Sequence, residues 1–172
     1  ACTDIDKALN ISSRISNRYI FSNAINDSIG AELSSVLKNV YALAAGVCNG
    51  LGYGDNFLAV LISNAVQELE RFLNKMHPLN RDVKSSAYLG DLLVTAYSIH
   101  SRNRRFGMMI GKGYSVKATQ IEMSMVAEGY YATKCIYELN KIHNVDAPIA
   151  KAMYHVLYDK ISPKIEIKIL SE

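Results

Sequence analysis

Cysteine is scarce in this chain: only Cys2, Cys48 and Cys135 occur among 172 residues, and they lie far apart. They form no CxxC pair, and the four histidines are scattered, so the ligand spacing of a metal-binding motif is absent. We therefore predict no metal site. Cys48 and Cys135 lie within apolar helical patterns, and we expect both to be small buried thiols in a reducing compartment.

Long apolar runs are also missing. No stretch of 18 or more apolar residues is present, and no basic segment followed by an apolar one opens the chain, so we expect a cytoplasmic protein without a transmembrane helix. The net charge is only +3, which excludes a strong nucleic-acid footprint. No GxGxxG motif follows a strand, so any nucleotide-binding domain lies elsewhere.

What the chain has in abundance is helical periodicity, and we predict a single all-α domain over residues 26–172. Asn26 and Asp27 supply capping side chains for a long helix that begins at Ser28. The glycines that follow it are expected to end it in a turn: Gly46, Gly50, Gly52 and Gly54. The other predicted helices begin at Asp55 or Asn56 and run to before Pro78, then cover residues 86–97, 102–111, 116–123, 126–143, 148–158 and a short stretch after Pro163.

Residues 1–25 differ from the rest of the chain. A polar helical turn is expected near Asp6–Ser13, followed by a short β-like run at Arg18–Ser22. One strand cannot be stable without a partner, so we expect it to belong to a sheet supplied by missing sequence. Nothing before Asn26 looks self-contained, and the chain is expected to begin partway through a larger protein.

Lys38 is the residue that most suggests chemistry. It is the only charged residue from Leu33 to Leu51, and on a helical wheel it points away from the apolar stripe. The face it shares is small and nearly uncharged: Ala31, Ser34, Ser35, Ala42, Ala45 and Asn49. Such a face indicates close packing or a cleft, where a poorly solvated lysine is a candidate acid or base because desolvation lowers its pKa. The alternative is a lysine that reaches the rim of an ordinary core helix.

A second candidate region is the polar segment 90–107. Asp91, Thr95, Ser98 and Arg102 would share one face of a continuous helix. Arg102 offers a fork of donors suited to phosphate, beside the uncharged donors Ser101 and Asn103. From spacing alone, a solvated helix face followed by a basic cap explains the pattern slightly better. Glu128, at the start of another helix, is explained by capping, with ribose binding as the functional alternative.

Taken together, these regions resemble bacterial NAD(P)-dependent glycerol-3-phosphate dehydrogenase. The matching segments occur in the same order and at comparable spacing: Lys38–Val40, Gly50–Asn56, Leu89–Leu92 with Thr95, Ser101–Gly107, Val126–Tyr130 and Asp146–Ile149. The resemblance covers nearly the whole chain. It implies the all-helical substrate domain, of the type found at the C-terminus of 6-phosphogluconate dehydrogenase. Residues 1–25 would then be a remnant of the N-terminal Rossmann domain, most of which is absent.

The resemblance implies the interconversion of dihydroxyacetone phosphate and sn-glycerol 3-phosphate with NADH or NADPH, a step that supplies glycerophospholipid synthesis. Lys38 matches the catalytic lysine. The implied substrate-binding residues are Lys38, Asn39, Asp91, Thr95, Ser101, Arg102 and Asn103, and the implied cofactor-binding residues are Arg102, Val126 and Glu128. The chain alone is expected to be inactive, because nothing in it holds a nicotinamide.

The chain departs from the family pattern at Tyr88, where a small glycine is usual, which bears on the packing beside Asp91. Two alternatives remain from the sequence. One is a related reductase of hydroxyacids or ketoacids with the same helical architecture. The other is a non-catalytic dimerisation module, in which the apolar helices near Leu58–Leu73 and Met153–Tyr158 would form a homodimer interface.

Overall fold

A computed structural model describes residues 1–171 and contains helices but no strand within them. The α-helices are α1 (Ile5–Ile15), α2 (Ser28–Gly50), α3 (Asp55–Met76), α4 (Asp91–Tyr97), α5 (Arg102–Gly111), α6 (Val116–Glu122), α7 (Glu128–His143), α8 (Pro148–Leu157) and α9 (Pro163–Ser171). A π-helical turn, η1 (Ser86–Gly90), leads directly into α4. The all-α prediction is confirmed.

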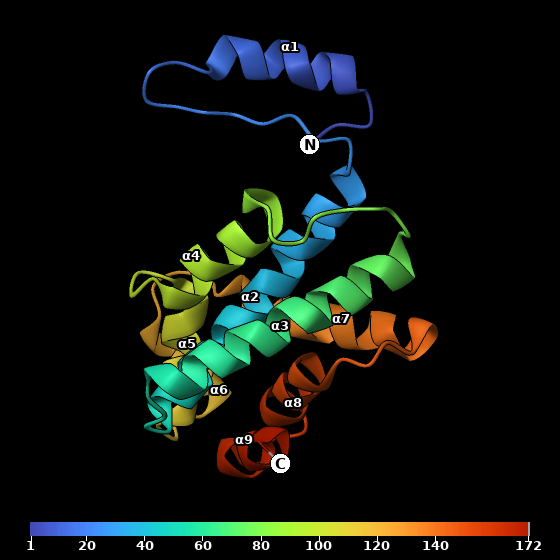
Figure 1. Ribbon diagram of the computed structural model, residues 1–172. Coiled ribbons are helices and arrows are strands. Elements are labelled where there is room, and N and C mark those ends of the chain that lie inside the picture. The colour runs from blue at the N-terminus through green and yellow to red at the C-terminus, as the bar shows by residue number, and fades with distance from the viewer. Residues whose placement is uncertain (172) are drawn as a thin grey trace.

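Helix α2 runs through the middle of the helical body, with α3, α4, α5, α7 and α8 packed around it (Figure 1). From Val40 to Cys48 every residue of α2 is buried, as expected for a helix that is apolar on all sides. The predicted cap is confirmed: the Asp27 carboxylate accepts from the backbone N–H of Gly30 at 2.9 Å.

Helices α2 and α5 cross at very short range because both carry glycine at the contact. A Cβ at Gly46 would lie 2.0 Å from the carbonyl oxygen of Arg104, and one at Gly107 would lie 2.0 Å from that of Leu43. The prediction that Gly46 helps to end α2 is therefore wrong, whereas Gly50 is the last residue of the helix, as predicted. Both glycines let α5 approach the backbone of α2, whereas Gly52, with φ +91°, forms the turn that follows.

The N-terminal segment stands apart from the helical body in Figure 1, and α1 buries none of its residues. The β-like run predicted at Arg18–Ser22 forms no strand within residues 1–171, and its pairing with a sheet outside this chain stays a prediction. No second strand exists among residues 1–171 to pair with it, and the segment forms a bend at Arg18 and Tyr19 and otherwise irregular backbone. The helix predicted for residues 86–97 is divided into η1 and α4, and α7 begins at Glu128 rather than Val126.

The two helical cysteines differ in burial. Cys48 is buried, as predicted, but Cys135 is exposed. Helix α7 packs on one side only, and Cys135 shares its outer face with Tyr131, Glu138 and Ile142. Among the described residues, no helix combines the length and the apolar character needed to cross a bilayer.

Candidate active site

The Lys38 side chain ends in an ion pair. Its Nζ lies 2.7 and 2.5 Å from the two carboxylate oxygens of Asp91, the first residue of α4. The lysine side chain is 19% exposed and the aspartate side chain 38%. The pair is charge-assisted and bidentate, and it joins two helices at the edge of a cavity.

This cavity has a volume of about 360 Å³ and a polar lining. Its walls come from α2, the α4–α5 region and the start of α7: Ser35, Lys38, Asn39, Val94, Thr95, Ser98, His100, Ser101, Arg102, Asn103 and Glu128. Larger hollows of about 820 and 710 Å³ lie elsewhere, one bordered by α3, α8 and α9 and the other by residues 110–120 and 156–163. Lys38 lines neither of these hollows. We therefore take the smaller cavity, which Lys38 does line, as the candidate active site.

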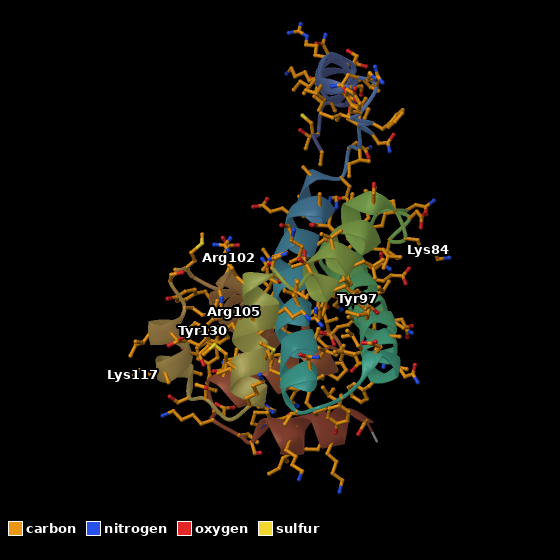
Figure 2. All side chains as sticks on the ribbon, turned by 90° about the vertical axis from the view of Figure 1, so that its left-hand side faces the viewer. Lys84, Tyr97, Arg102, Arg105, Lys117 and Tyr130 are labelled. Atoms are coloured by element: carbon orange, nitrogen blue, oxygen red, sulfur yellow. The ribbon has the colours of Figure 1, made fainter. Side chains whose placement is uncertain are left out.

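The N-terminus of α5 forms one wall of this cavity. The Ser101 side chain accepts from the backbone N–H of Arg104 and caps the helix. Arg102 is exposed, and its side chain forms no hydrogen bond or ion pair among the described residues. Figure 2 shows it at the upper end of α5, with Arg105 further down the same helix. Free backbone N–H groups beside an unpaired guanidinium suit a phosphate or carboxylate.

The floor of the cavity is held by two asparagines. The Asn103 amide donates to Asn39 Oδ1 at 2.8 Å and accepts from the backbone N–H of Gly129 at 2.8 Å, while Asn39 donates to Ser35 O at 3.0 Å. A Cβ at Gly129 would lie 2.6 Å from the Asn39 carbonyl oxygen. The two amides thus tie α2, α5 and α7 together where the cavity needs a fixed shape.

The polar stripe predicted on one continuous helix is in fact interrupted. Helix α4 ends at Tyr97, whose carbonyl accepts from Arg104 Nη1 at 2.6 Å, and α5 begins only at Arg102. Despite this break, the residues of the stripe lie close together at the cavity. Thr95, Ser98 and Arg102 line the cavity. Asp91 is not part of the lining but binds the side chain of Lys38, which is. The Thr95 hydroxyl donates to Asp91 O at 2.7 Å, so its oxygen remains able to accept from a ligand.

Of the residues assigned to the cofactor, the structure places two beside the cavity and one outside it. Glu128 and Arg102 belong to the lining, whereas Val126 borders a separate hollow with Phe106 and Tyr131. Sequence reasoning did not single out His100 or Val94 as lining residues. Their position in the α4–α5 region, between residues it did single out, was the available signal. In residues 1–171, no three His, Cys, Asp or Glu side chains converge on a metal-sized site.

Comparison with known proteins shows which family the chain belongs to. The family model for the C-terminus of NAD-dependent glycerol-3-phosphate dehydrogenase matches residues 27–168. A glycerol-3-phosphate dehydrogenase (NAD(P)+) from Lysinibacillus sphaericus is 39% identical over 170 residues, covering 99% of this chain and 50% of that protein. One from Staphylococcus aureus is 42% identical over 156 residues, covering 91% of this chain and 47% of the relative.

Solved structures give the same result. The glycerol-3-phosphate dehydrogenase of Coxiella burnetii superposes with a TM-score of 0.91 at 29% identity, over 97% of this chain and 51% of that one. The enzyme from Saccharomyces cerevisiae gives a TM-score of 0.86 at 25% identity, over 94% of this chain and 48% of that one. The chain spans about half the length of the relatives it matches. It belongs to the family formed by the C-terminal part of NAD-dependent glycerol-3-phosphate dehydrogenases.

Proposed function

We propose that this chain is the substrate-binding and catalytic half of a glycerol-3-phosphate dehydrogenase that interconverts dihydroxyacetone phosphate and sn-glycerol 3-phosphate. The observation that carries the proposal is the convergence of a lysine–aspartate pair and an unpaired arginine at a helix N-terminus on one cavity. As further parts of the same proposal, the reaction occurs in the cytoplasm and its product supplies glycerophospholipid synthesis.

The anionic end of the substrate binds at α5. The Arg102 guanidinium and the backbone N–H groups of the first turn neutralise the phosphate charge, and the Ser101 cap fixes that turn. A phosphate anchored there leaves a chain of three carbons to extend toward Lys38. This arrangement favours a phosphorylated substrate over the hydroxyacids and ketoacids of related reductases.

Proton transfer is assigned to Lys38. In the reduction its ammonium donates a proton to the carbonyl oxygen, and in the oxidation its amine takes that proton back. The positive charge also stabilises the developing alkoxide. Asp91 holds the lysine in place through both carboxylate oxygens, and the Thr95 oxygen can accept from a substrate hydroxyl.

The family's cofactor is NAD or NADP, which supplies or accepts the hydride when bound. Residues of this chain fit one edge of such a molecule. Glu128 can accept from ribose hydroxyls and Arg102 can pair with a phosphate at the cavity, while Val126, at 60% exposure, offers apolar surface nearby. The remainder of the cofactor site is assigned to the half of the protein that the relatives have in addition.

The first test replaces Lys38 and Arg102 by alanine in the full-length protein. Loss of general acid catalysis in Lys38→Ala should lower kcat by at least roughly 10²–10⁴-fold, and lost charge stabilisation should lower it further. Arg102→Ala should raise KM for dihydroxyacetone phosphate while leaving the unfolding temperature nearly unchanged, because Arg102 is exposed. NADH oxidation with dihydroxyacetone phosphate and with unphosphorylated dihydroxyacetone measures both effects.

Two exposed residues serve as matched controls: Lys117→Ala for the lysine and Arg105→Ala, one turn further along α5, for the arginine (Figure 2). Both should retain normal kinetics. Near-normal turnover in Lys38→Ala, or an unchanged KM in Arg102→Ala, would refute the corresponding role.

A homodimer is a separate part of the proposal, and its interface needs revision. The apolar stripes first considered for it face the chain's own core, since Leu61, Leu69, Phe72, Met153 and Leu157 are all buried. Exposed apolar side chains remain on α3 and α9: Val60, Ile165 and Ile169. Light scattering of the full-length protein tests the assembly, and an Ile169→Asp variant tests this face.

A further inference from the structure

A buried ionic cluster lies at the start of α2, away from the cavity, and the mechanism above leaves it without a role. Asp27, the cap of α2, accepts from Arg81 Nε at 2.7 Å and from the Tyr88 hydroxyl at 2.7 Å, in addition to Gly30 N. Asp27 and Tyr88 are each 3% exposed, and so is the Arg81 side chain. We call these three residues the Asp27 cluster.

The cluster is charged and tightly fitted. Burial alone would raise the pKa of Asp27, but hydrogen bonds from Arg81 and Tyr88 outweigh it and lower the pKa to about 2. Arg81 also donates to the His77 carbonyl at 2.8 Å. A Cβ at Gly30 would lie 2.0 Å from Asp27 Oδ2, so only a glycine at this position leaves enough room for the Asp27 carboxylate. Removal of one partner would leave a buried charge incompletely paired.

The cluster is connected to the Lys38–Asp91 pair from both sides. On one side, Lys38 lies on α2, eleven residues after Asp27, or about 16 Å along the helix at 1.5 Å per residue. On the other side, the backbone N–H of Asp91 donates to the carbonyls of Ser86 and Tyr88 in η1. Tyr88 therefore binds α2 through its hydroxyl and Asp91 through its carbonyl.

From this connectivity we propose that the Asp27 cluster positions the catalytic pair, with Tyr88 as a positioning residue that sets where Asp91 meets Lys38. The irregular geometry of η1 fits this role, because π-helical turns need support from their surroundings and occur frequently at functional sites. Tyr88 is not one of the residues that line the cavity, and it acts through Asp91. The inference rests on the proposed function, because it assumes that Lys38 transfers the proton.

The test is Tyr88→Phe in the full-length protein, which removes one hydroxyl and keeps the ring. Because small misplacements of reacting groups are costly, kcat should fall on the order of tenfold. KM for dihydroxyacetone phosphate should change by less than about twofold, since the phosphate is bound by α5 and the hydrogen bonds of the cluster go to other segments. Tyr114→Phe, an exposed tyrosine beyond the far end of α5, is the matched control and should behave as wild type.

A double-mutant cycle separates positioning from a general loss of stability. If Tyr88 acts through Asp91, Tyr88→Phe should have no further effect on kcat in an Asp91→Asn background. Full kcat in Tyr88→Phe, or additive losses in the double variant, would overturn the inference. Should Tyr88→Phe not fold, Arg81→Lys, which keeps the charge opposite Asp27, replaces it with the same expected results. Normal turnover in Lys38→Ala would instead refute the proton-transfer role on which the inference rests, and the absence of dihydroxyacetone phosphate turnover in the wild-type full-length protein would refute the proposed function itself.

Discussion

Glu68 on α3 is a carboxylate with no exposed surface that caps a different helix. It accepts from the backbone N–H groups of Ile149 and Ala150 at 2.7 and 3.0 Å, in the first turn of α8. Pro148 occupies the first position of that helix and has no N–H to donate. Burial raises the pKa of Glu68 to about 7, although the two amides and the nearby Arg71 act to lower it.

This shift gives stability a pH dependence of known sign. Between the ordinary carboxyl pKa of 4.5 and about 7, the folded chain keeps a proton that the unfolded chain has lost. The stabilisation is therefore complete below about pH 4.5 and is lost as the pH rises through about 7. We expect the free energy of unfolding to fall between pH 5 and pH 8, by up to about 3 kcal/mol. Urea unfolding at the two pH values measures it.

Glu68→Gln removes the titrating group and should flatten this dependence. Glu138→Gln is the matched control, because Glu138 is an exposed glutamate on α7 whose loss should leave the slope unchanged. A slope that persists in Glu68→Gln would assign the pH dependence to other groups.

Lys38 and Glu68 show what single residues reveal in sequence. Lys38 could be singled out as a candidate site residue because it is the only charged residue in a long apolar stretch, which is a local property of the sequence. Glu68 could not, because its meaning depends on amides 81 and 82 residues away. Tyr88 was noticed only as a departure from the family pattern, and its partner Asp27 lies 61 residues earlier in the chain.

At the scale of elements, the crossing of α2 and α5 decides the geometry of the site. Each helix carries two glycines four residues apart at the contact: Gly46 and Gly50 on α2, Gly107 and Gly111 on α5. Helix α2 carries Lys38 and α5 carries Arg102, so this crossing sets how far the proposed proton donor lies from the proposed phosphate-binding turn.

Gly107→Ala should therefore damage both stability and binding. In an open helix this change is favourable, but here the new Cβ would meet the Leu43 carbonyl oxygen at 2.0 Å and push the two backbones apart. Overpacking of this kind costs about 1–3 kcal/mol, and KM for dihydroxyacetone phosphate should rise as α5 moves. Thermal unfolding and steady-state kinetics of the full-length protein measure the two effects.

Gly54→Ala is the comparison, since a Cβ at Gly54 would meet nothing within 4 Å. If Gly107→Ala proved as harmless as Gly54→Ala, the close crossing would not be needed for the fold. Sequence periodicity placed both helices correctly but assigned Gly46, which lies inside α2, to the helix end. The weak helix propensity of glycine supports that interpretation. Only the close contact with α5 explains why a glycine lies inside α2.

At the scale of the whole molecule, the chain has two unequal parts. The helical body is built around α2, whereas residues 1–25 form a segment with many exposed apolar side chains, among them Leu9 at 54%, Ile11 at 60% and Phe21 at 90%. The β-like pattern of Arg18–Ser22 predicted a strand because its residue types favour one. Without a neighbouring strand among the described residues, the segment stays irregular. Its assignment as a remnant of a dinucleotide-binding domain stays a prediction.

Removing residues 1–25 tests the proposed boundary between the two parts. Helix α1 buries no residue, and the hydrogen bonds of the segment, such as Cys2 N to Ile25 O and Ser12 to Ser22, stay within it. The free energy of unfolding of residues 26–172 should therefore match that of the whole chain within about 0.5 kcal/mol, as for other surface changes. Binding of a hydrophobic dye should fall, because the exposed apolar side chains of the segment are removed with it.

A loss of more than about 2 kcal/mol on truncation would mean that the segment packs on the helical body in solution, since ordinary surface changes do not reach that size. In that case the two parts would fold as one unit, and the domain boundary would have to be placed before residue 26.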